Sequence, residues 1–276
     1  MITVLINAHR GDPIQYRENT MPAFASAVRL GADCIELDIR CSLDNQAAVL
    51  HDETLNRLWG IARTVASMTY DDIFQLTKSS DLYIPRLEEV LGTFDVPIMI
   101  DFDDETAVQP ILRALADYPA AAERCIISSG QVPALMAIRS ELKHVSIALT
   151  WNDIIPPHDS LLQSLDAQYF NPNYRVYEDE FVAQMSRSLQ TAEPDVYSAL
   201  IEDGLEQRAR HPEWYAFDEI CGSHLVAQMH ERHRKVSAWT VDDAAVMTTM
   251  LQLGVDLVTT NDTRTLMEVR NGTYSE

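Results

Sequence analysis

Eight short apolar segments with high β-propensity recur along the chain, and segments with helical periodicity separate most of them. Strands this apolar are usually buried on both faces, which is typical of a parallel sheet covered by helices. The predicted strands are 2–6, 34–39, 96–101, 125–128, 145–150, 167–171, 236–241 and 255–260. The predicted helices are 21–30, 86–93, 105–117, 131–142, 158–165, 178–188, 222–232 and 243–253. This alternation predicts an α/β fold, a (β/α)8 TIM barrel, with a doubly wound open sheet as the alternative.

Two segments interrupt the alternation. After the second strand, residues 40–52 predict a small hairpin with its turn at Asp44 and Asn45. Between the sixth and seventh strands, residues 187–221 are charged and helix-like, and they exceed the length of an ordinary connection. No low-complexity linker divides the chain. We therefore expect residues 1–276 to form one domain, with 187–221 as an insertion.

Composition argues against several classes of partner and compartment. The formal net charge is −21, and so acidic a chain should repel nucleic acid and anionic membranes. No run of about 18 apolar residues is present, so we expect no stable membrane association. The apolar segment 2–6 is too short for the core of a signal peptide. The four cysteines form no Cys-x-x-Cys pair, which favours free thiols in a cytoplasmic protein over a zinc site. The oligomeric state stays open.

The ends of the first three predicted strands carry an unusual concentration of charge. In a barrel, the carboxyl ends of the strands form one rim, and that rim carries the active site. The charged residues at these ends are His9 and Arg10, Glu36 and Asp38, and Asp101 and Asp103. The later strand ends carry polar or aromatic residues instead. The sequence therefore predicts a charged site on one side of the rim.

Glu36 and Asp38 lie two residues apart in a predicted strand, so their side chains point to the same face. If this face is the barrel interior, two carboxylates share a confined space and repel each other unless a cation is bound. Oxygen ligands of this kind suit Mg²⁺ or Ca²⁺, and Asp101 on the next strand would complete the set. The alternative is that both side chains face outward and pair with helix residues.

Two histidines are predicted near these carboxylates. His9 follows the first strand, and His51 ends the hairpin. Such a pair suits acid–base catalysis, because one imidazole can accept a proton while the other donates one. Asp52 could orient the His51 ring. Taken singly, a histidine is more often structural. We assign that role to the other six, which are His144, His158, His211, His224, His230 and His233.

The segment after His9 combines features of an anion site and of a helix start. The planar fork of Arg10 suits phosphate oxygens, and Gly11 permits a tight turn with close approach of the backbone. Thr20 is predicted as the helix N-cap, with Pro22 in the first turn.

Together, these segments resemble the glycerophosphodiester phosphodiesterase family, whose fold is a TIM barrel. The matching segments are "AHRG" (8–11), "ENTMPAFASAVRLGADCIELDI" (18–39), "AVLHDETLNR" (48–57), "IPRLEEVL" (84–91), "VSAWTV" (236–241) and "GVDLVTTN" (254–261). Each motif alone is a weak signal, and their order and spacing carry the resemblance. The resemblance implies a hydrolase of lipid and glycerol metabolism. It would convert a small-molecule glycerophosphodiester to sn-glycerol 3-phosphate and an alcohol with a divalent cation, Mg²⁺ or Ca²⁺.

Motif by motif, the resemblance also implies individual roles. The implied catalytic residues are His9 and His51. The implied substrate-binding residues are Arg10 and Trp239. The implied metal ligands are Glu36, Asp38 and Asp101. Asp101 stands where the family has the glutamate of a Glu-Ile-Lys-like motif. Trp239 stands where the family usually has an aromatic residue, which would cover a glycerol or choline group or pack under the barrel mouth.

Two positions depart from the family pattern. Asp103 replaces a lysine that neutralises phosphate charge in the transition state, and Asn261 replaces a frequent aspartate. Three readings follow from the first departure. The chain is an active phosphodiesterase, in which Asp103 holds a second cation or another basic residue substitutes for the lysine. Otherwise it is an impaired member that binds a phosphodiester or phosphate, or a phospholipase-D-like relative that forms a cyclic phosphate. We favour the active enzyme, because a pure binder needs no pair of histidines.

Overall fold

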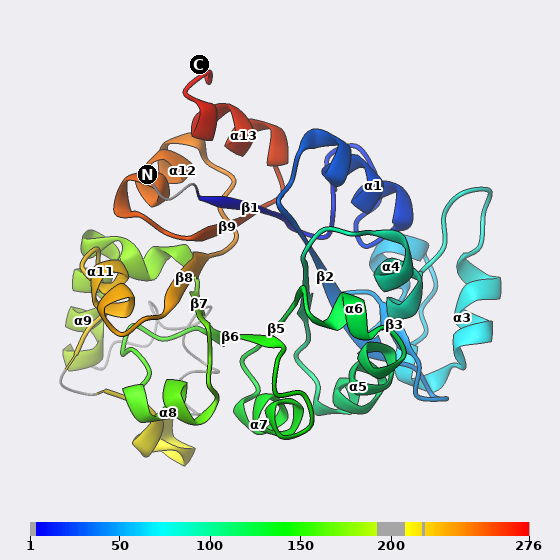
Figure 1. Ribbon diagram of the computed structural model, residues 1–276, viewed down its shortest axis with the longest axis horizontal. Helices are drawn as coiled ribbons and strands as arrows, with labels where there is room; N and C mark the ends of the chain where they lie inside the picture. The colour runs from blue at the N-terminus through cyan, green and yellow to red at the C-terminus, as the bar shows by residue number, and fades with distance from the viewer. Residues whose placement is uncertain (1–3, 192–207, 217–218, 276) are drawn as a thin grey trace.

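Eight parallel strands close on themselves to form a barrel in this computed structural model, which describes residues 4–191, 208–216 and 219–275 (Figure 1). The barrel strands are β1 (Leu5–Ala8), β2 (Cys34–Cys41), β4 (Ile98–Asp101), β5 (Cys125–Ser129), β6 (Ser146–Trp151), β7 (Tyr169–Pro172), β8 (Lys235–Ala238) and β9 (Leu257–Thr260). Strand β1 closes the barrel because it pairs with β9 on one side and with β2 on the other. The predicted TIM barrel is therefore confirmed, and the alternative of an open sheet is wrong.

Helices surround the strands on the outside of the barrel (Figure 1). The longer helices are α1 (Met21–Leu30), α3 (Tyr70–Thr77), α4 (Leu87–Thr93), α5 (Val108–Asp117), α7 (Val132–Glu141), α8 (Asp159–Ser164), α9 (Asp179–Thr191), α11 (Leu225–Glu231), α12 (Ala244–Leu253) and α13 (Thr263–Asn271). Short helices are α2 (Asn56–Trp59) and α6 (Pro119–Ala122). Each predicted helix overlaps an observed one. Helices α2, α3, α6 and α13 were not predicted from the sequence.

The period-2 pattern of β2 connects the apolar barrel interior to its charged mouth. Cys34 lies in an interior cluster with Met99 and residues of four further strands. Glu36 and Asp38 follow Cys34 at spacings of two, so they point to the same side, nearer the carboxyl end. The register of β2 and β4 sets Asp38 directly beside Asp101. Strand alternation puts these carboxylates on the same face as Cys34, and the interior position of Cys34 shows that this face points into the barrel.

The predicted hairpin after the second strand is confirmed. Strand β3 (Ala47–Val49) pairs antiparallel with the end of β2, and Asn45 has a positive φ of 59° at the turn. The chain between this hairpin and α4 builds a small core of its own, with α3 outside the ring of helices (Figure 1). Its buried members are Ala48, Leu50, Leu55, Val65, Met68, Tyr70, Ile73 and Ile84.

The long connection between β7 and β8 is the second interruption. Its described part contains the 3₁₀ turns η3 (Tyr174–Tyr177) and η5 (Pro212–Trp214) as well as α9 and α11. Of the predicted insertion at 187–221, residues 192–207 and 217–218 lie outside the described residues. Residues 208–216 reach the loop after β6, where the His158 amide donates to the Trp214 carbonyl oxygen at 2.7 Å. The Ala216 amide likewise donates to the Pro156 carbonyl oxygen at 3.0 Å.

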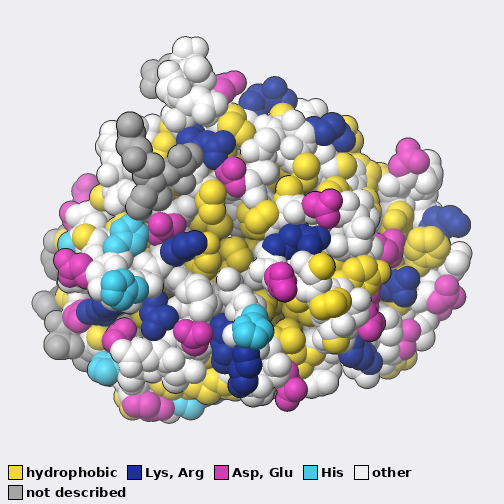
Figure 2. Space-filling view, viewed as in Figure 1, with side chains coloured by type: hydrophobic (Ala, Val, Ile, Leu, Met, Phe, Trp, Pro, Cys, Tyr) yellow, Lys and Arg dark blue, Asp and Glu magenta, His cyan; other side chains and the backbone are white. Residues whose placement is uncertain are grey.

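Among the helices of the described ranges, none has the length and apolar character that crossing a membrane requires. Figure 2 shows basic and acidic side chains interspersed with hydrophobic ones on one face, so the net charge does not form one continuous acidic surface there.

Candidate active site

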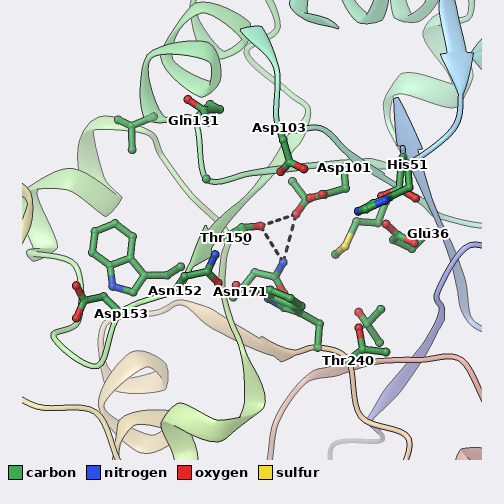
Figure 3. Close-up of a pocket in the computed structure, with 18 of the residues that line it drawn as sticks. Glu36, His51, Asp101, Asp103, Gln131, Thr150, Asn152, Asp153, Asn171 and Thr240 are labelled. Carbon is green, nitrogen blue, oxygen red and sulfur yellow. Dashed lines mark hydrogen bonds between the residues drawn. The ribbon is translucent and has the colours of Figure 1, made fainter. Parts of the chain in front are cut away.

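A cavity of about 800 Å³ opens at the carboxyl ends of the barrel strands. Its lining includes residues that lie within or just after each parallel strand, toward the carboxyl end, as the fold predicts for a functional site. Figure 3 shows Glu36, His51 and Asp101 on one side of the cavity and Gln131, Asn152 and Asp153 on the opposite side. The charged side matches the rim predicted from the sequence. The opposite side lies where the later strand ends were expected to carry polar or aromatic residues, but Gln131, Asn152 and Asp153 were not predicted individually.

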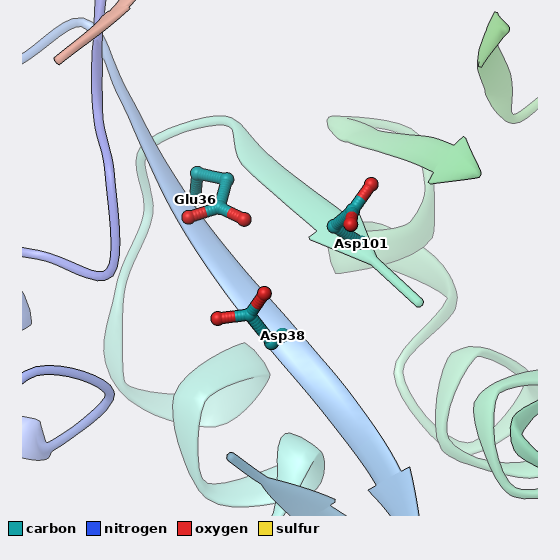
Figure 4. A group of neighbouring side chains, drawn as sticks. All are labelled: Glu36, Asp38 and Asp101. Carbon is teal, nitrogen blue, oxygen red and sulfur yellow. The ribbon is translucent and has the colours of Figure 1, made fainter. Parts of the chain in front are cut away.

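Three carboxylates converge on the charged side. Glu36 and Asp38 project from β2, and Asp101 projects from the end of β4 (Figure 4). One carboxylate oxygen from each lies within 4.8 Å of the others. Oxygen ligands lie about 2.0–2.6 Å from Mg²⁺ or Ca²⁺, so these oxygens are close enough to share one such ion. Glu36 and Asp38 are buried and line the cavity at the barrel mouth, so the outward-facing alternative is wrong.

The crowding of these carboxylates changes their proton affinity. Burial raises the pKa of Glu36 well above its usual range, and the charges of Asp38 and Asp101 raise it further. Burial also raises the pKa of Asp101 to about 8, with Asp103 and Asp38 as the neighbouring charges. Without a cation, the carboxylates of this cluster would therefore be partly protonated near neutral pH.

Arg10 packs against the carboxylates from the first loop. Its backbone amide donates to Glu36 Oε2 at 2.8 Å, its Nε lies 3.1 Å from Asp38 Oδ2, and its Nη1 donates to Glu18 Oε1 at 2.8 Å. Asn19, which follows Glu18, donates from Nδ2 to Asp38 Oδ2 at 2.7 Å. Neither a role for Asn19 nor this contact was predicted from the sequence. Loop and strand therefore hold the guanidinium and two of the carboxylates in one fixed arrangement.

The tautomer of His9 follows from its neighbours. Asn261 Nδ2 donates to Asp242 Oδ2 at 2.7 Å, and a carboxylate can only accept, so the amide oxygen of Asn261 faces His9. His9 Nδ1 lies 2.7 Å from this oxygen and therefore carries the hydrogen. Burial lowers the pKa of His9 below its usual value, and Arg10 lowers it further. A neutral imidazole is thus favoured, with Nε2 as the proton acceptor.

His51 is held by a network that returns to Arg10. His51 Nδ1 donates to Asp52 Oδ1 at 2.9 Å, as the sequence analysis anticipated. Arg57 binds Asp52 through Nε at 2.7 Å, and its Nη2 donates to Glu18 Oε1, also at 2.7 Å. Hydrogen bonding to Arg57 lowers the pKa of Asp52 to about 2. Glu18 also binds Arg10, so Arg57 connects the two loops that carry the predicted catalytic histidines.

Asp103 lies on the rim of the cavity and forms an ion pair with Arg40. Its side chain is 63% exposed, and Oδ2 lies 3.7 Å from Nη2 of Arg40. Arg40 also donates from Nε to the carbonyl oxygen of His51 at 2.6 Å. Arg40 is thus a basic residue close to the position at which the family resemblance implies a lysine.

The floor between the two sides of the cavity is neutral and polar. Asn171 Nδ2 donates to Thr150 Oγ1 (Figure 3) and to Ser128 Oγ, each at 3.2 Å. Ser237 Oγ donates to Asn171 Oδ1 at 2.6 Å. The ring of Trp239 is half-buried at the cavity wall, and Nε1 donates to the Asn171 carbonyl oxygen at 3.0 Å. Trp239 therefore both lines the cavity and packs at its mouth.

The structure brings together every site residue that the sequence analysis proposed, because the cavity lining includes His9, Arg10, Glu36, Asp38, His51, Asp101 and Trp239. It also includes His211, to which we assigned only a structural role. The contacts of Asn19, Arg57 and Asp242 were missed. Their signal in the sequence is weak, since Asn19 and Asp242 bind partners 19 positions away, and Arg57 links the nearby Asp52 to Glu18, which is 39 positions away.

Comparisons with known proteins agree with this geometry. A model described as "Glycerophosphoryl diester phosphodiesterase family" matches residues 9–265. A glycerophosphodiester phosphodiesterase from Bacillus altitudinis is 31% identical over 185 residues, which cover 62% of this chain and 76% of that protein. Another, from Caldanaerobacter subterraneus subsp. tengcongensis, is 28% identical over 284 residues, which cover 97% of this chain and 98% of that protein.

Solved structures share the fold along nearly the full length. A phosphodiesterase from Oleispira antarctica, in complex with the product sn-glycerol-3-phosphate, has a TM-score of 0.73 at 16% identity and covers 97% of this chain and 96% of its own. A glycerophosphodiester phosphodiesterase from Thermotoga maritima has a TM-score of 0.68 at 19% identity and covers 96% of this chain and 98% of its own. At these identities the likeness shows the fold alone.

Proposed function

The chain belongs to the glycerophosphoryl diester phosphodiesterase family, and from that premise we propose that it hydrolyses glycerophosphodiesters to sn-glycerol 3-phosphate and an alcohol. The observation that carries the proposal is the convergence of three carboxylates in a cavity also lined by His9 and His51. The named relatives are phosphoric diester hydrolases, and the Oleispira antarctica structure contains the product that we propose here.

The donor set fits a hard divalent cation. Glu36, Asp38 and Asp101 offer only oxygen atoms, and their separation suits a single ion of the size of Mg²⁺ or Ca²⁺. The raised pKa values of Glu36 and Asp101 indicate negative charge that lacks compensation, which a cation would supply. When bound, the cation would supply charge stabilisation to the phosphoryl oxygens.

His9 is suited to act as the general base. Its neutral form is favoured by burial, and its Nδ1 hydrogen is held by Asn261, so Nε2 is the nitrogen that can accept a proton. The proton would come from the oxygen that attacks phosphorus. Asp242 helps to orient the His9 ring indirectly, because it fixes the amide of Asn261.

His51 is suited to act as the general acid. Its Nδ1 hydrogen is held by Asp52, so Nε2 is the nitrogen that can donate a proton to the leaving alcohol. The His51 side chain is 40% exposed, which leaves it accessible to a leaving group of variable size. Arg10, beside the carboxylates, would bind a phosphate oxygen through its planar fork.

The proposed activity has a direct test. The protein is incubated with glycerophosphocholine and related diesters in Mg²⁺, Ca²⁺ or EDTA, and sn-glycerol 3-phosphate is detected enzymatically. We expect cation-dependent turnover, and a loss of about 100- to 10,000-fold in His9→Ala. The exposed His144 provides the matched control, because His144→Ala removes an imidazole outside the cavity. Absence of turnover with any metal would favour a binding protein, and a cyclic phosphate product would favour the phospholipase-D-like alternative.

Asp103→Lys separates the roles open to Asp103. If Asp103 only weakens catalysis by repelling phosphate, restoring a cation should raise kcat. If it contributes to a second cation site, or orients Arg40 through their ion pair, the same change should lower kcat. Asp103→Asn removes the charge without adding one and distinguishes repulsion from loss of the ion pair.

We also propose that residues 1–276 form a single domain, with 187–221 as an insertion between β7 and β8. The continuous match of the family model over residues 9–265 supports this division. Limited proteolysis that leaves the barrel intact after cleavage within 187–221 would agree with it, and a stable fragment that ends elsewhere would contradict it.

A further inference from the structure

The three carboxylates of the candidate cation site are held from two different directions. On one side, the loop after β1 donates hydrogen bonds to Glu36 and Asp38. Asp101 lies on the other side, and the register of β4 and β5 sets it directly beside Ser128. Burial raises the pKa of Asp101, and a hydrogen bond from Ser128 opposes that rise. Whatever fixes the Ser128 hydroxyl therefore also affects the third carboxylate.

Ser128 belongs to a buried polar network on the barrel floor. Asn171 Nδ2 on β7 lies 3.2 Å from Thr150 Oγ1 on β6 (Figure 3) and 3.2 Å from Ser128 Oγ, and the two hydroxyl oxygens are 2.9 Å apart. On the other side of the amide, Ser237 Oγ on β8 donates to Asn171 Oδ1 at 2.6 Å. Ser128 and Ser237 are fully buried, and Asn171 is 4% exposed. With Asp101 on β4, the network crosses five neighbouring strands.

The direction of these hydrogen bonds follows from the carboxylate at one end. An ionised Asp101 can only accept, so Ser128 donates its single hydroxyl hydrogen to it. Thr150 then donates to Ser128, which has no second hydrogen to give. Because neither hydroxyl has a hydrogen left for Asn171, the group of Asn171 that faces both of them is its NH2 group. The amide oxygen of Asn171 consequently faces Ser237, which donates to it.

Both hydrogens of the Asn171 amide are used inside the protein. One is donated to Ser128 and the other to Thr150, so neither is free for a ligand in the cavity. These two bonds favour the arrangement in which Ser128 donates to Asp101. Without the amide, the two hydroxyls can exchange the roles of donor and acceptor, because their oxygens already lie 2.9 Å apart. The exchange would direct the Ser128 hydrogen away from the carboxylate.

We propose that Asn171 is a positioning residue of the cation site, which orients the Asp101 carboxylate through Ser128. The inference rests on the proposed function, since the site is the one that would hold the divalent cation. Residues that orient a metal ligand from outside contribute about 10- to 100-fold to metal affinity. Asn171→Leu keeps a side chain of similar size and removes the amide, so it should weaken Ca²⁺ binding by a factor in that range.

Calorimetric titration of the metal-free protein with CaCl₂ measures this effect without turnover. Ser128→Ala removes the hydroxyl that contacts Asp101 and should weaken Ca²⁺ binding at least as much as Asn171→Leu. Thr259→Val is the matched control. Thr259 also lines the cavity, and its Oγ1 accepts from Asn7 Nδ2 at 2.9 Å, so this variant loses a buried hydrogen bond outside the network. Its Ca²⁺ affinity should equal that of the native protein.

A double-mutant cycle separates positioning from a general loosening of the barrel. If Asn171 acts through Ser128, adding Asn171→Leu to Ser128→Ala should weaken Ca²⁺ binding little further. An equal loss with and without Ser128, or an unchanged affinity in Asn171→Leu, would overturn the proposal. Should Asn171→Leu not fold, Ser237→Ala, which frees the amide oxygen, takes its place in the cycle, and the same outcomes decide.

The outcomes also distinguish this inference from the proposed function. Intact Ca²⁺ binding without turnover of any diester would contradict the proposed function, while the affinities of the variants would still decide the role of Asn171. Absence of Ca²⁺ and Mg²⁺ binding in the native protein would contradict both.

Discussion

At the scale of single residues, the site has more negative than positive charge, and neutral amides hold its charged side chains in place. The carboxylates of Glu36, Asp38 and Asp101 meet at one point, while the guanidinium of Arg10 approaches them from one side only. Asn19 and Asn261 carry no charge, yet each fixes a charged or titrating neighbour through an amide that can both donate and accept. The orientation of the groups is thus set before any ligand binds.

The raised pKa of Asp101 predicts an unusual dependence of stability on pH. Its carboxyl has a pKa of about 8 in the folded protein and of about 3.9 when unfolded. Between these values the folded state binds more protons than the unfolded state, so this group's contribution to stability declines as pH rises from about 4 to 8. A bound cation replaces the proton, so Ca²⁺ should raise Tm more at pH 8 than at pH 5.

Melting curves by circular dichroism at pH 5, 6.5 and 8, with EDTA or Ca²⁺, measure this effect. Asp101→Asn removes the titrating group, so the metal-free variant should lose less stability than the native protein between pH 5 and 8. If the two metal-free proteins change in parallel across that range, the cluster is not the source of the dependence.

Arg57 is expected to be a positioning residue for His51. It binds Asp52 and Glu18 at once, so Arg57→Ala frees Asp52 and lets the imidazole rotate. We expect kcat to fall about 10- to 100-fold, as is usual for residues that orient a functional group, with a smaller change in KM. Arg57→Lys should recover part of kcat, because it keeps the charge without the fork.

The pH profile of kcat separates this role from a structural one. Arg57→Ala removes the group that lowers the pKa of Asp52, so the acidic limb of the profile should move to higher pH, whereas loss of stability alone would leave the profile in place. Arg63 is exposed in the same connection between β3 and α4, and Arg63→Ala is the matched control. An unchanged kcat in Arg57→Ala would contradict the assignment.

At the scale of elements, strand periodicity made the charged half of the site predictable. The spacing of Glu36 and Asp38 placed both on one face, and the structure shows that this face points into the barrel mouth. Periodicity alone does not fix the ends of a strand, because these depend on which residues pair with a neighbouring strand. The apolar run 2–6 predicted the first strand. Residues 2 and 3 lie outside the described residues, and among the described ones pairing with β9 runs from Leu5 to Ala8, past the predicted end. Thr20 does occupy the N-cap position of α1, but its Oγ1 donates to the Arg17 carbonyl oxygen at 2.6 Å and makes no cap bond.

Gly11 is where the first loop meets helix α1. Its φ is +87°, and a Cβ placed there would lie 2.6 Å from the carbonyl carbon of Ala23 and 2.8 Å from the amide nitrogen of Phe24. Because both are backbone atoms, α1 or the loop must move. Gly11→Ala should lower the free energy of unfolding by on the order of 3 kcal/mol or more.

Gly254 provides the matched control for this prediction. It has a similar φ of +81°, and a Cβ added there would have no described atom within 4 Å, so Gly254→Ala tests backbone strain alone. We expect a loss of about 1–2 kcal/mol for it. Urea denaturation measures both variants, and equal losses would show that the contact with α1 is unimportant.

At the scale of the whole molecule, one side of the cavity is made by the barrel and the other partly by a segment far along the chain. Residues 208–216 contact the loop after β6 through pairs such as Arg208 and Asp153, which stand 55 positions apart. Sequence patterns describe local periodicity, so a contact of this kind left no signal. The site residues on the barrel side could be predicted from the sequence, because they lie near the ends of successive strands.

Arg208→Ala should loosen this segment while leaving the barrel folded. It leaves Asp153 buried without its partner, and breaking a buried ion pair in this way costs about 3–5 kcal/mol. Hydrogen exchange should accelerate at amides of 208–216, with protection in the barrel strands retained. Arg264→Ala changes an exposed arginine and serves as the control. Faster exchange throughout the barrel would show that the pair supports the whole fold instead.

The closure of the barrel at β1 has a consequence for synthesis. Leu5 pairs with Leu257, so the first strand waits for a partner that the ribosome makes some 250 residues later. At translation rates of about 5–20 residues per second, that interval is about 12–50 s. During this time one edge of β1 is an open template for any extended chain nearby. The nascent protein is therefore most vulnerable to misassembly before its last strand emerges, and a chaperone that shields the N-terminal half would matter most in that interval.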